Sequence, residues 1–79
     1  MITYTEFQEM LARQLRLSSP DEVKPGSRIK KDLGADSLDI LQLLMKLEDN
    51  YGYVIPDEEL AHFETVADVL AYLQIPVTD

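Results

Sequence analysis

The stretch DLGADSLDIL, residues 32–41, leads from a flexible Gly-Ala pair through Asp and Ser into an apolar run. Asp36 suits the N-cap of a helix, because its short side chain can accept the free backbone N–H groups of a first turn. Asp39, three residues on, reinforces this start and places negative charge where the helix dipole favours it. Ser37 then falls in the first turn, with its hydroxyl at the rim of the helix. A phosphate attached to that hydroxyl would lie against the positive end of the dipole.

The helix that begins at Ser37 is predicted to extend to about Tyr51 and to carry two apolar stripes. One stripe is sufficient for a core face and consists of Ile40, Leu43, Leu44, Leu47 and Tyr51. The second stripe borders Ser37 and consists of Leu38, Leu41 and Met45. Because a helix with one buried face needs no second stripe, we expect either packing under the preceding loop or an exposed docking patch. We favour the docking patch, since the flexible side chain of Met45 suits a surface that several partners share.

The rest of the chain also has a helical pattern. Apolar spacing predicts a first helix from about Tyr4 to Arg16 and a last helix that follows a cap at Thr65. Residues 57–61 indicate a short acidic helix between the second and the last. We therefore predict one all-α domain over residues 1–79. Its fold is a small antiparallel bundle of three main helices plus one short helix, with a long first loop.

The long first loop is predicted because Pro20, Pro25 and Gly26 interrupt the helical pattern within residues 17–35. A connection of this length in a small domain is usually held by its own apolar side chains, and we expect Ile29 and Leu33 to do so. The loop also contains a short basic cluster, which we interpret as a solvated face. That cluster consists of Arg28, Lys30 and Lys31.

The composition is strongly acidic, with 15 Asp and Glu against 7 Lys and Arg and a formal charge of −8. Nucleic-acid binding is excluded, because it needs basic residues to neutralise phosphates, whereas partner proteins with basic surfaces suit this charge. The lack of Cys excludes disulfides and thiolate metal sites, so any thioester chemistry needs a thiol from a prosthetic group. No signal peptide or membrane-spanning run is recognisable, which makes the cytoplasm the expected compartment.

No catalytic residue and no metal site are predicted, so we expect that the domain is not an enzyme. Ser37 lacks a partner for nucleophilic catalysis, because His62, the sole histidine, is expected at a helix surface or edge. The sequence GADSL, residues 34–38, also lacks the second glycine of a nucleophile elbow. Helix capping and partner contact explain Asp36 and Asp39 without an active-site cleft. No acidic run has the spacing of an EF-hand.

Three blocks of sequence are informative together, namely DLGADSL at 32–38, IPDEE at 55–59 and TVADV at 65–69. These blocks resemble the acyl carrier proteins of the fatty-acid type, in a similarity that extends over about residues 4–73. A serine at a helix start is usually a structural cap, but in that family this serine carries 4'-phosphopantetheine through a phosphodiester. The resemblance implies that Ser37 is the attachment residue and that a phosphopantetheinyl transferase loads it from coenzyme A.

The same resemblance implies a monomeric carrier that holds acyl groups as thioesters and delivers them to enzymes with basic docking surfaces. Fatty acid biosynthesis is the expected pathway, and a carrier for a polyketide or other specialised pathway is the alternative within the family. The alternative from another class is an unmodified helical domain whose second stripe binds a partner helix. The residues expected to dock partners are Asp36, Leu38, Asp39, Leu41 and Met45.

An apolar acyl chain has a physical reason to fold back into the bundle, because each exposed CH₂ group costs roughly 0.8 kcal/mol relative to burial. The expected path lies between the second helix and the short third helix. Its predicted lining is Leu47, Ile55, Leu60, Ala61 and Phe63. The competing expectation is a fully packed core without room for cargo.

Overall fold

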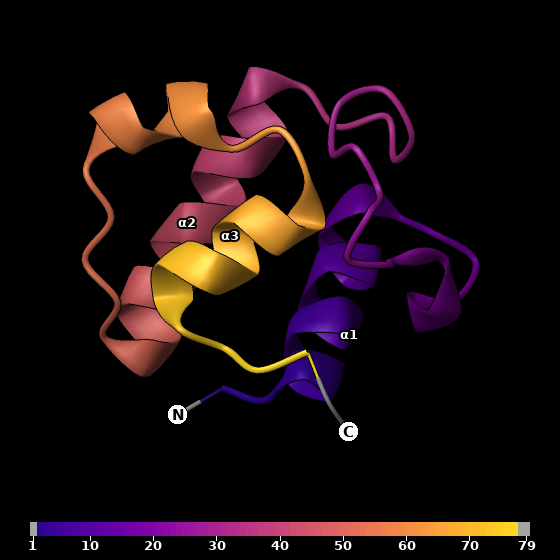
Figure 1. Cartoon of the computed structure of the whole chain (residues 1–79), viewed down its shortest axis with the longest axis horizontal. Helices are drawn as coiled ribbons and strands as arrows, with labels where there is room; N and C mark the ends of the chain where they lie inside the picture. Colours follow the sequence, from indigo (N-terminus) through magenta and orange to yellow (C-terminus); the bar gives the residue numbers. More distant parts are fainter. Residues whose placement is uncertain (1, 78–79) are drawn as a thin grey trace.

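The computed structural model describes residues 2–77, and of Asp57 the backbone alone. Within this range the chain forms three α-helices and two short 3-10 helices, and it contains no strand. Figure 1 shows the helices gathered around a common centre, with the loop before α2 at the upper right and η2 at the upper left. The all-α bundle with a long first loop is therefore confirmed. In chain order the elements are α1 (Tyr4–Leu15), η1 (Pro20–Glu22), α2 (Ser37–Tyr51), η2 (Asp57–His62) and α3 (Val66–Leu73).

Local side-chain chemistry sets the helix boundaries. Each α-helix begins with a capping box, in which the cap side chain and the side chain three residues on bond to each other's backbone N–H. The three caps are Thr3, Asp36 and Thr65. Gly52 ends α2 with φ 76°, a left-handed conformation that glycine adopts without strain. The predicted bounds of α2 are correct to the residue for this reason.

The short third helix differs from its prediction, because η2 is a 3-10 helix and extends one residue further, to His62. Its start follows Pro56 and has no side-chain cap, so nothing local stabilises a longer α-helix there. The loop before α2 contains one further helical turn, η1, which Ser19 caps.

The three α-helices bury one shared apolar core. From α1 the buried side chains include Phe7 and Leu11, while Met10 and Leu15 pack at the edge. The predicted face of α2 is buried through Ile40, Leu43, Leu44 and Leu47, and α3 adds Val66, Val69, Leu70 and Leu73. Among the side chains that the structure describes, no polar or charged residue is buried. The hydrophobic effect of this core is the main source of stability for the fold.

The loop before α2 is tied to α1 and to α3. Val23 is fully buried, and its carbonyl accepts a 2.7 Å hydrogen bond from the Gln8 side chain of α1. Ile29 is 1% exposed, and its backbone N–H donates to the Glu64 carbonyl at 2.9 Å. The predicted role of Ile29 is confirmed, and Leu33 packs against the core while partly exposed. These contacts fix the loop and therefore the approach of the chain to Ser37.

Candidate functional site

Ser37 is the first residue of α2, and its side chain is exposed. Asp36 holds this helix start, because its Oδ1 accepts the Asp39 N–H at 2.9 Å. In return, Asp39 Oδ2 accepts the Asp36 N–H at 3.1 Å. Each carboxylate thereby satisfies a backbone donor that the helix leaves free. The serine hydroxyl is not consumed in capping and faces outward, as the sequence predicted.

A tight turn delivers the chain to this helix start. Gly34 has φ 75°, which a residue with a Cβ atom adopts only at an energetic cost. The next residue, Ala35, is buried, and its N–H donates to the Ile29 carbonyl at 3.1 Å. The Gly-Ala pair thus turns the chain and anchors it immediately before the helix. Ser37 is consequently presented by a fixed loop on one side and a capped helix on the other.

Lys30 contacts the serine, a contact that sequence reasoning missed. Its Nζ donates to Ser37 Oγ at 3.4 Å. We interpreted Arg28, Lys30 and Lys31 as one solvated loop face, and the structure separates their roles. The Gly34 turn reverses the chain between Lys30 and Ser37, so a turn predicted there was the available signal for their proximity.

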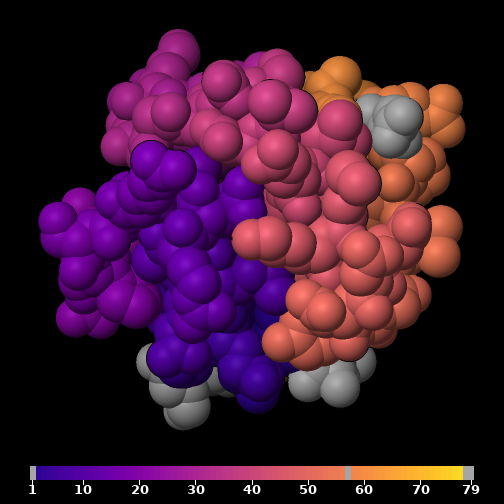
Figure 2. Space-filling view, turned by 180° about the vertical axis from the view of Figure 1, so that it is seen from behind, coloured from indigo at the N-terminus to yellow at the C-terminus, as the bar shows by residue number. Residues whose placement is uncertain are grey.

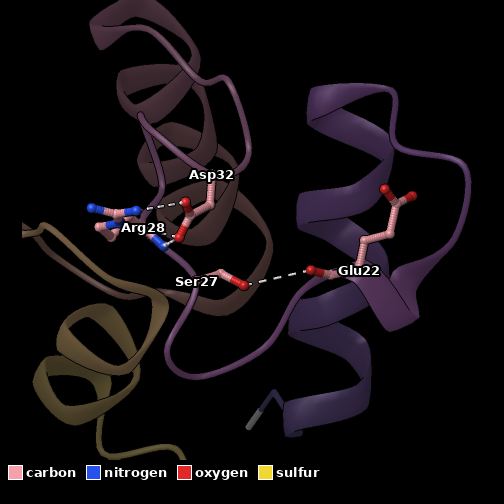
Figure 3. A network of polar contacts seen from close by, with 4 residues as sticks. All are labelled: Glu22, Ser27, Arg28 and Asp32. Atoms are coloured by element: carbon pink, nitrogen blue, oxygen red, sulfur yellow. Dashed lines mark hydrogen bonds and ion pairs between the residues drawn. The ribbon is translucent and has the colours of Figure 1, made fainter.

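Arg28 is engaged within the loop rather than with the serine. Its guanidinium pairs with Asp32 at 3.1 Å, as Figure 3 shows, and both side chains remain about half exposed. Hydrogen bonding by Arg28 holds the pKa of the Asp32 carboxyl below its ordinary value, and Asp32 raises the pKa of Arg28 in turn. The same view shows Ser27 bonded to the Glu22 carbonyl of η1 at 3.5 Å. Arg28 and Asp32 therefore shape the loop that carries Lys30.

The second stripe of α2 is open to solvent. Leu38 is 59% exposed and Met45 is 56% exposed, whereas Leu41 between them is half-buried. Packing of this stripe beneath the loop, the first of our two expectations, is therefore wrong. Among the predicted docking carboxylates, Asp36 is exposed and Asp39 is half-buried. Figure 2 shows α1 and α2 side by side on the face of the molecule seen from behind.

The predicted acyl-chain residues divide into two groups. Leu60, Ala61 and Phe63 line an open groove of about 460 Å³. The basic residues of the loop also line it, as do the polar side chains of His62, Glu64 and Asp68. Leu47 and Ile55 do not line this groove. Leu47 is fully buried in the core, and Ile55 is half-buried beside it. The structure thus brings three of the five residues together.

Hydrolytic and metal chemistry find no support among residues 2–77. His62 is exposed at the end of η2, and nothing places it in contact with Ser37. The side chains that the structure describes include no group of His, Asp and Glu that could hold a metal ion. Within the same residues, no helix has the length and apolar character needed to cross a membrane.

A covalently attached phosphodiester fits the surroundings of Ser37. The hydroxyl is exposed, the ammonium of Lys30 lies at hydrogen-bond distance, and the neighbouring Asp36 and Asp39 carboxylates are occupied in capping. An anion at this position would meet a cation and the N-terminal end of α2.

Comparison with known proteins shows the family of the chain. Residues 5–73 match the family described as "Phosphopantetheine attachment site". The chain is 42% identical to an acyl carrier protein of Wolinella succinogenes over 94% of its own length and 96% of that protein. It is 43% identical to an acyl carrier protein of Helicobacter hepaticus, with the same two coverages, and 39% identical to one of Helicobacter pylori strain G27, with 94% of each chain covered. The chain belongs to the acyl carrier proteins, which are phosphopantetheine-dependent carriers and not enzymes.

Proposed function

We propose that Ser37 is the residue to which 4'-phosphopantetheine is attached, and that residues 1–79 act as one carrier domain. The observation that carries this proposal is the exposed Ser37 hydroxyl at the first position of α2, inside the region that matches the attachment-site family. When bound, the group supplies a thiol that holds acyl groups as thioesters. The chain has no Cys of its own, so this thiol is not available elsewhere in it. The domain contributes a fixed attachment point and surfaces that partner enzymes bind.

Intact mass spectrometry tests the attachment residue. The wild-type chain, Ser37→Ala and Ser18→Ala are each incubated with coenzyme A and a broad-specificity phosphopantetheinyl transferase. Wild type and Ser18→Ala are expected to gain one phosphopantetheinyl group, and Ser37→Ala is expected to gain none. Ser18 is a suitable control because it is an exposed serine of the same chain in the loop after α1. Modification of Ser37→Ala would contradict the proposal.

The docking surface for partner enzymes consists of Asp36, Leu38, Asp39, Leu41 and Met45. Its support is the exposure of Leu38 and Met45 on the helix that begins at the modified serine. Apolar side chains on a surface lose solvent contact when a partner binds, which favours association. Asp36 adds negative charge, which suits a basic partner surface.

Steady-state kinetics of the transferase test this surface. Leu38→Ala and Met45→Ala are expected to lower kcat/KM for modification by about fivefold or more if the stripe is the contact. Val54→Ala is the matched control, because Val54 is 77% exposed and lies outside α2. An equal loss in Val54→Ala, or no loss in either stripe variant, would argue against the surface.

The acyl chain on the arm is proposed to fold back along Leu47, Ile55, Leu60, Ala61 and Phe63. The groove beside Leu60, Ala61 and Phe63 supports an opening there, and the buried Leu47 supplies an apolar end to the path. Lengthening the cargo from a short to a medium acyl chain is expected to raise Tm and to shift NMR signals of Leu47 and Phe63. Ala61→Leu is expected to reduce that gain without affecting modification of Ser37. If the NMR signals and the Tm do not change with the length of the acyl chain, the cargo stays outside the bundle.

Fatty acid biosynthesis in the cytoplasm is the proposed setting, with the chain acting as a monomer. The support is its acidity and its Asp-Ser-Leu motif, which resemble the fatty-acid branch of the family. To test this, the acylated protein is incubated with condensing enzymes of the fatty-acid and polyketide types, and the acyl products are identified by intact mass spectrometry. Extension by the polyketide enzyme alone would assign the chain to the alternative pathway. Size-exclusion chromatography with light scattering checks the monomer.

A further inference from the structure

Three cations form the loop side of the 460 Å³ groove, and they differ in what they contact. Arg28 is paired with Asp32. Lys30 contacts Ser37 Oγ. Lys31 makes no hydrogen bond or ion pair with any side chain that the structure describes, although its charge acts on Asp32. Lys30 is thus the member of this cluster that lies both at the serine and on the groove.

We propose that Lys30 binds the phosphodiester of the arm on Ser37 and directs the first part of the arm toward the groove. This inference rests on the proposed attachment at Ser37. Attachment forms a bond between Ser37 Oγ and a phosphorus of coenzyme A, breaks the pyrophosphate bond of coenzyme A, and releases adenosine 3',5'-bisphosphate and the hydroxyl proton. The transferred phosphorus keeps one negatively charged oxygen. The Lys30 ammonium already lies 3.4 Å from the bridging oxygen, so a short side-chain adjustment brings it to that charge.

The pairing has a directional consequence. Lys30 belongs to the loop and lines the groove, whereas the exposed stripe of Leu38 and Met45 belongs to α2. A phosphodiester held by Lys30 therefore lies at the edge of a groove in which Leu60 and Phe63 offer apolar contact to the arm, beside the carboxylates of Glu64 and Asp68. An exposed ion pair shifts the equilibrium between the arm held at Lys30 and the arm free in solvent by about two- to fivefold. The arm therefore remains free to leave when a partner enzyme competes for the phosphate.

Matched variants of the modified protein test the inference. Lys30→Gln and Lys31→Gln remove the same charge from adjacent exposed positions, and Lys30→Arg keeps the charge at the contact. Each variant is converted with coenzyme A and transferase, and intact mass verifies one group on Ser37. The ³¹P NMR signal is then recorded at low and high NaCl, together with NOEs from the arm's geminal methyl groups to Phe63.

In the wild-type protein we expect a ³¹P shift that depends on salt and NOEs to Phe63. Lys30→Gln is expected to lose most of both, while Lys31→Gln and Lys30→Arg retain them. A Lys30→Gln protein that is modified but has an unchanged ³¹P signal and unchanged NOEs would overturn the inference and leave the proposed function intact. Equal losses in Lys31→Gln would overturn it too, because the effect would then be diffuse charge. A wild-type chain that gains no group would refute the proposed function first and this inference with it.

Discussion

Asp36 is a helix cap in the structure and a proposed docking charge, and substitution can separate the two roles. Its Oδ1 accepts the Asp39 N–H at 2.9 Å, and its side chain is exposed. Asp36→Ala removes that acceptor, and loss of an N-cap costs about 1 kcal/mol. In a domain of this size such a loss lowers Tm by about 4–8 °C. Asp36→Asn keeps an equivalent cap, so its Tm is expected to stay close to that of the wild type.

The proposed docking role of Asp36 would depend on its charge, so it should respond differently to the two substitutions. Both Asp36 variants lose the carboxylate, so both are expected to lower kcat/KM for modification by the transferase, by about two- to fivefold for an exposed pair. Thr65→Ala is the control, because Thr65 caps α3 in the same way. It is expected to lose similar thermal stability while being modified at the wild-type rate.

Calorimetry and the transferase assay on these proteins give results that could contradict each role. An unchanged Tm in Asp36→Ala would show that the capping box contributes nothing to stability. A Tm that falls equally in Asp36→Asn would assign the stabilisation to charge. Wild-type kinetics in both variants would remove Asp36 from the docking surface.

Acid, salt and core perturbations provide three further predictions. Hydrogen bonds from Arg28 to Asp32, and from the Thr65 and Glu64 backbone N–H groups to Asp68, keep both carboxyl pKa values low. These groups therefore stabilise the fold above about pH 4. Urea denaturation should show that the free energy of unfolding declines as pH falls through the lowered pKa values, and this decline should be less steep in Asp68→Asn. About 0.5 M NaCl should raise Tm by screening the net charge of −8, and an unchanged Tm would mean that the repulsion is negligible. Ile29→Ala should cost about 2–5 kcal/mol in urea denaturation, and a cost below 1 kcal/mol would show that the loop is not held there.

Local signals made the main helices predictable from the sequence. The bounds of α2 follow from Asp36 as cap and Gly52 as terminator, both of which act within a few residues. The same holds for α3, where Thr65 and Asp68 form the predicted box. The acidic run before Leu60 also favours a helix, but six residues that follow a proline without a side-chain cap gain too little to form an α-helix.

The parts of the candidate site that sequence reasoning missed depend on tertiary contacts. The exposure of the second stripe on α2 depends on where the loop lies, so the sequence favours an exposed patch but does not exclude packing under the loop. The contact of Lys30 with Ser37 arises because buried Ile29 and Ala35 hold both ends of the turn between them. No apolar periodicity and no capping pattern in the sequence indicates that Lys30 and Ser37 lie close together.

The backbone tie between the loop and α3 has a consequence for how this domain opens. Ile29 donates to the Glu64 carbonyl, Val66 donates to the Ser27 carbonyl, and Ala67 donates to the Pro25 carbonyl. Segments far apart in the chain thus share one set of hydrogen bonds, so the amide protons of Ile29, Val66 and Ala67 should exchange with solvent in a single opening event. A movement of α3 away from the bundle would be transmitted through these hydrogen bonds to the loop before Ser37. We therefore expect the loop before Ser37, the proposed attachment point, and the last helix to open as one cooperative unit.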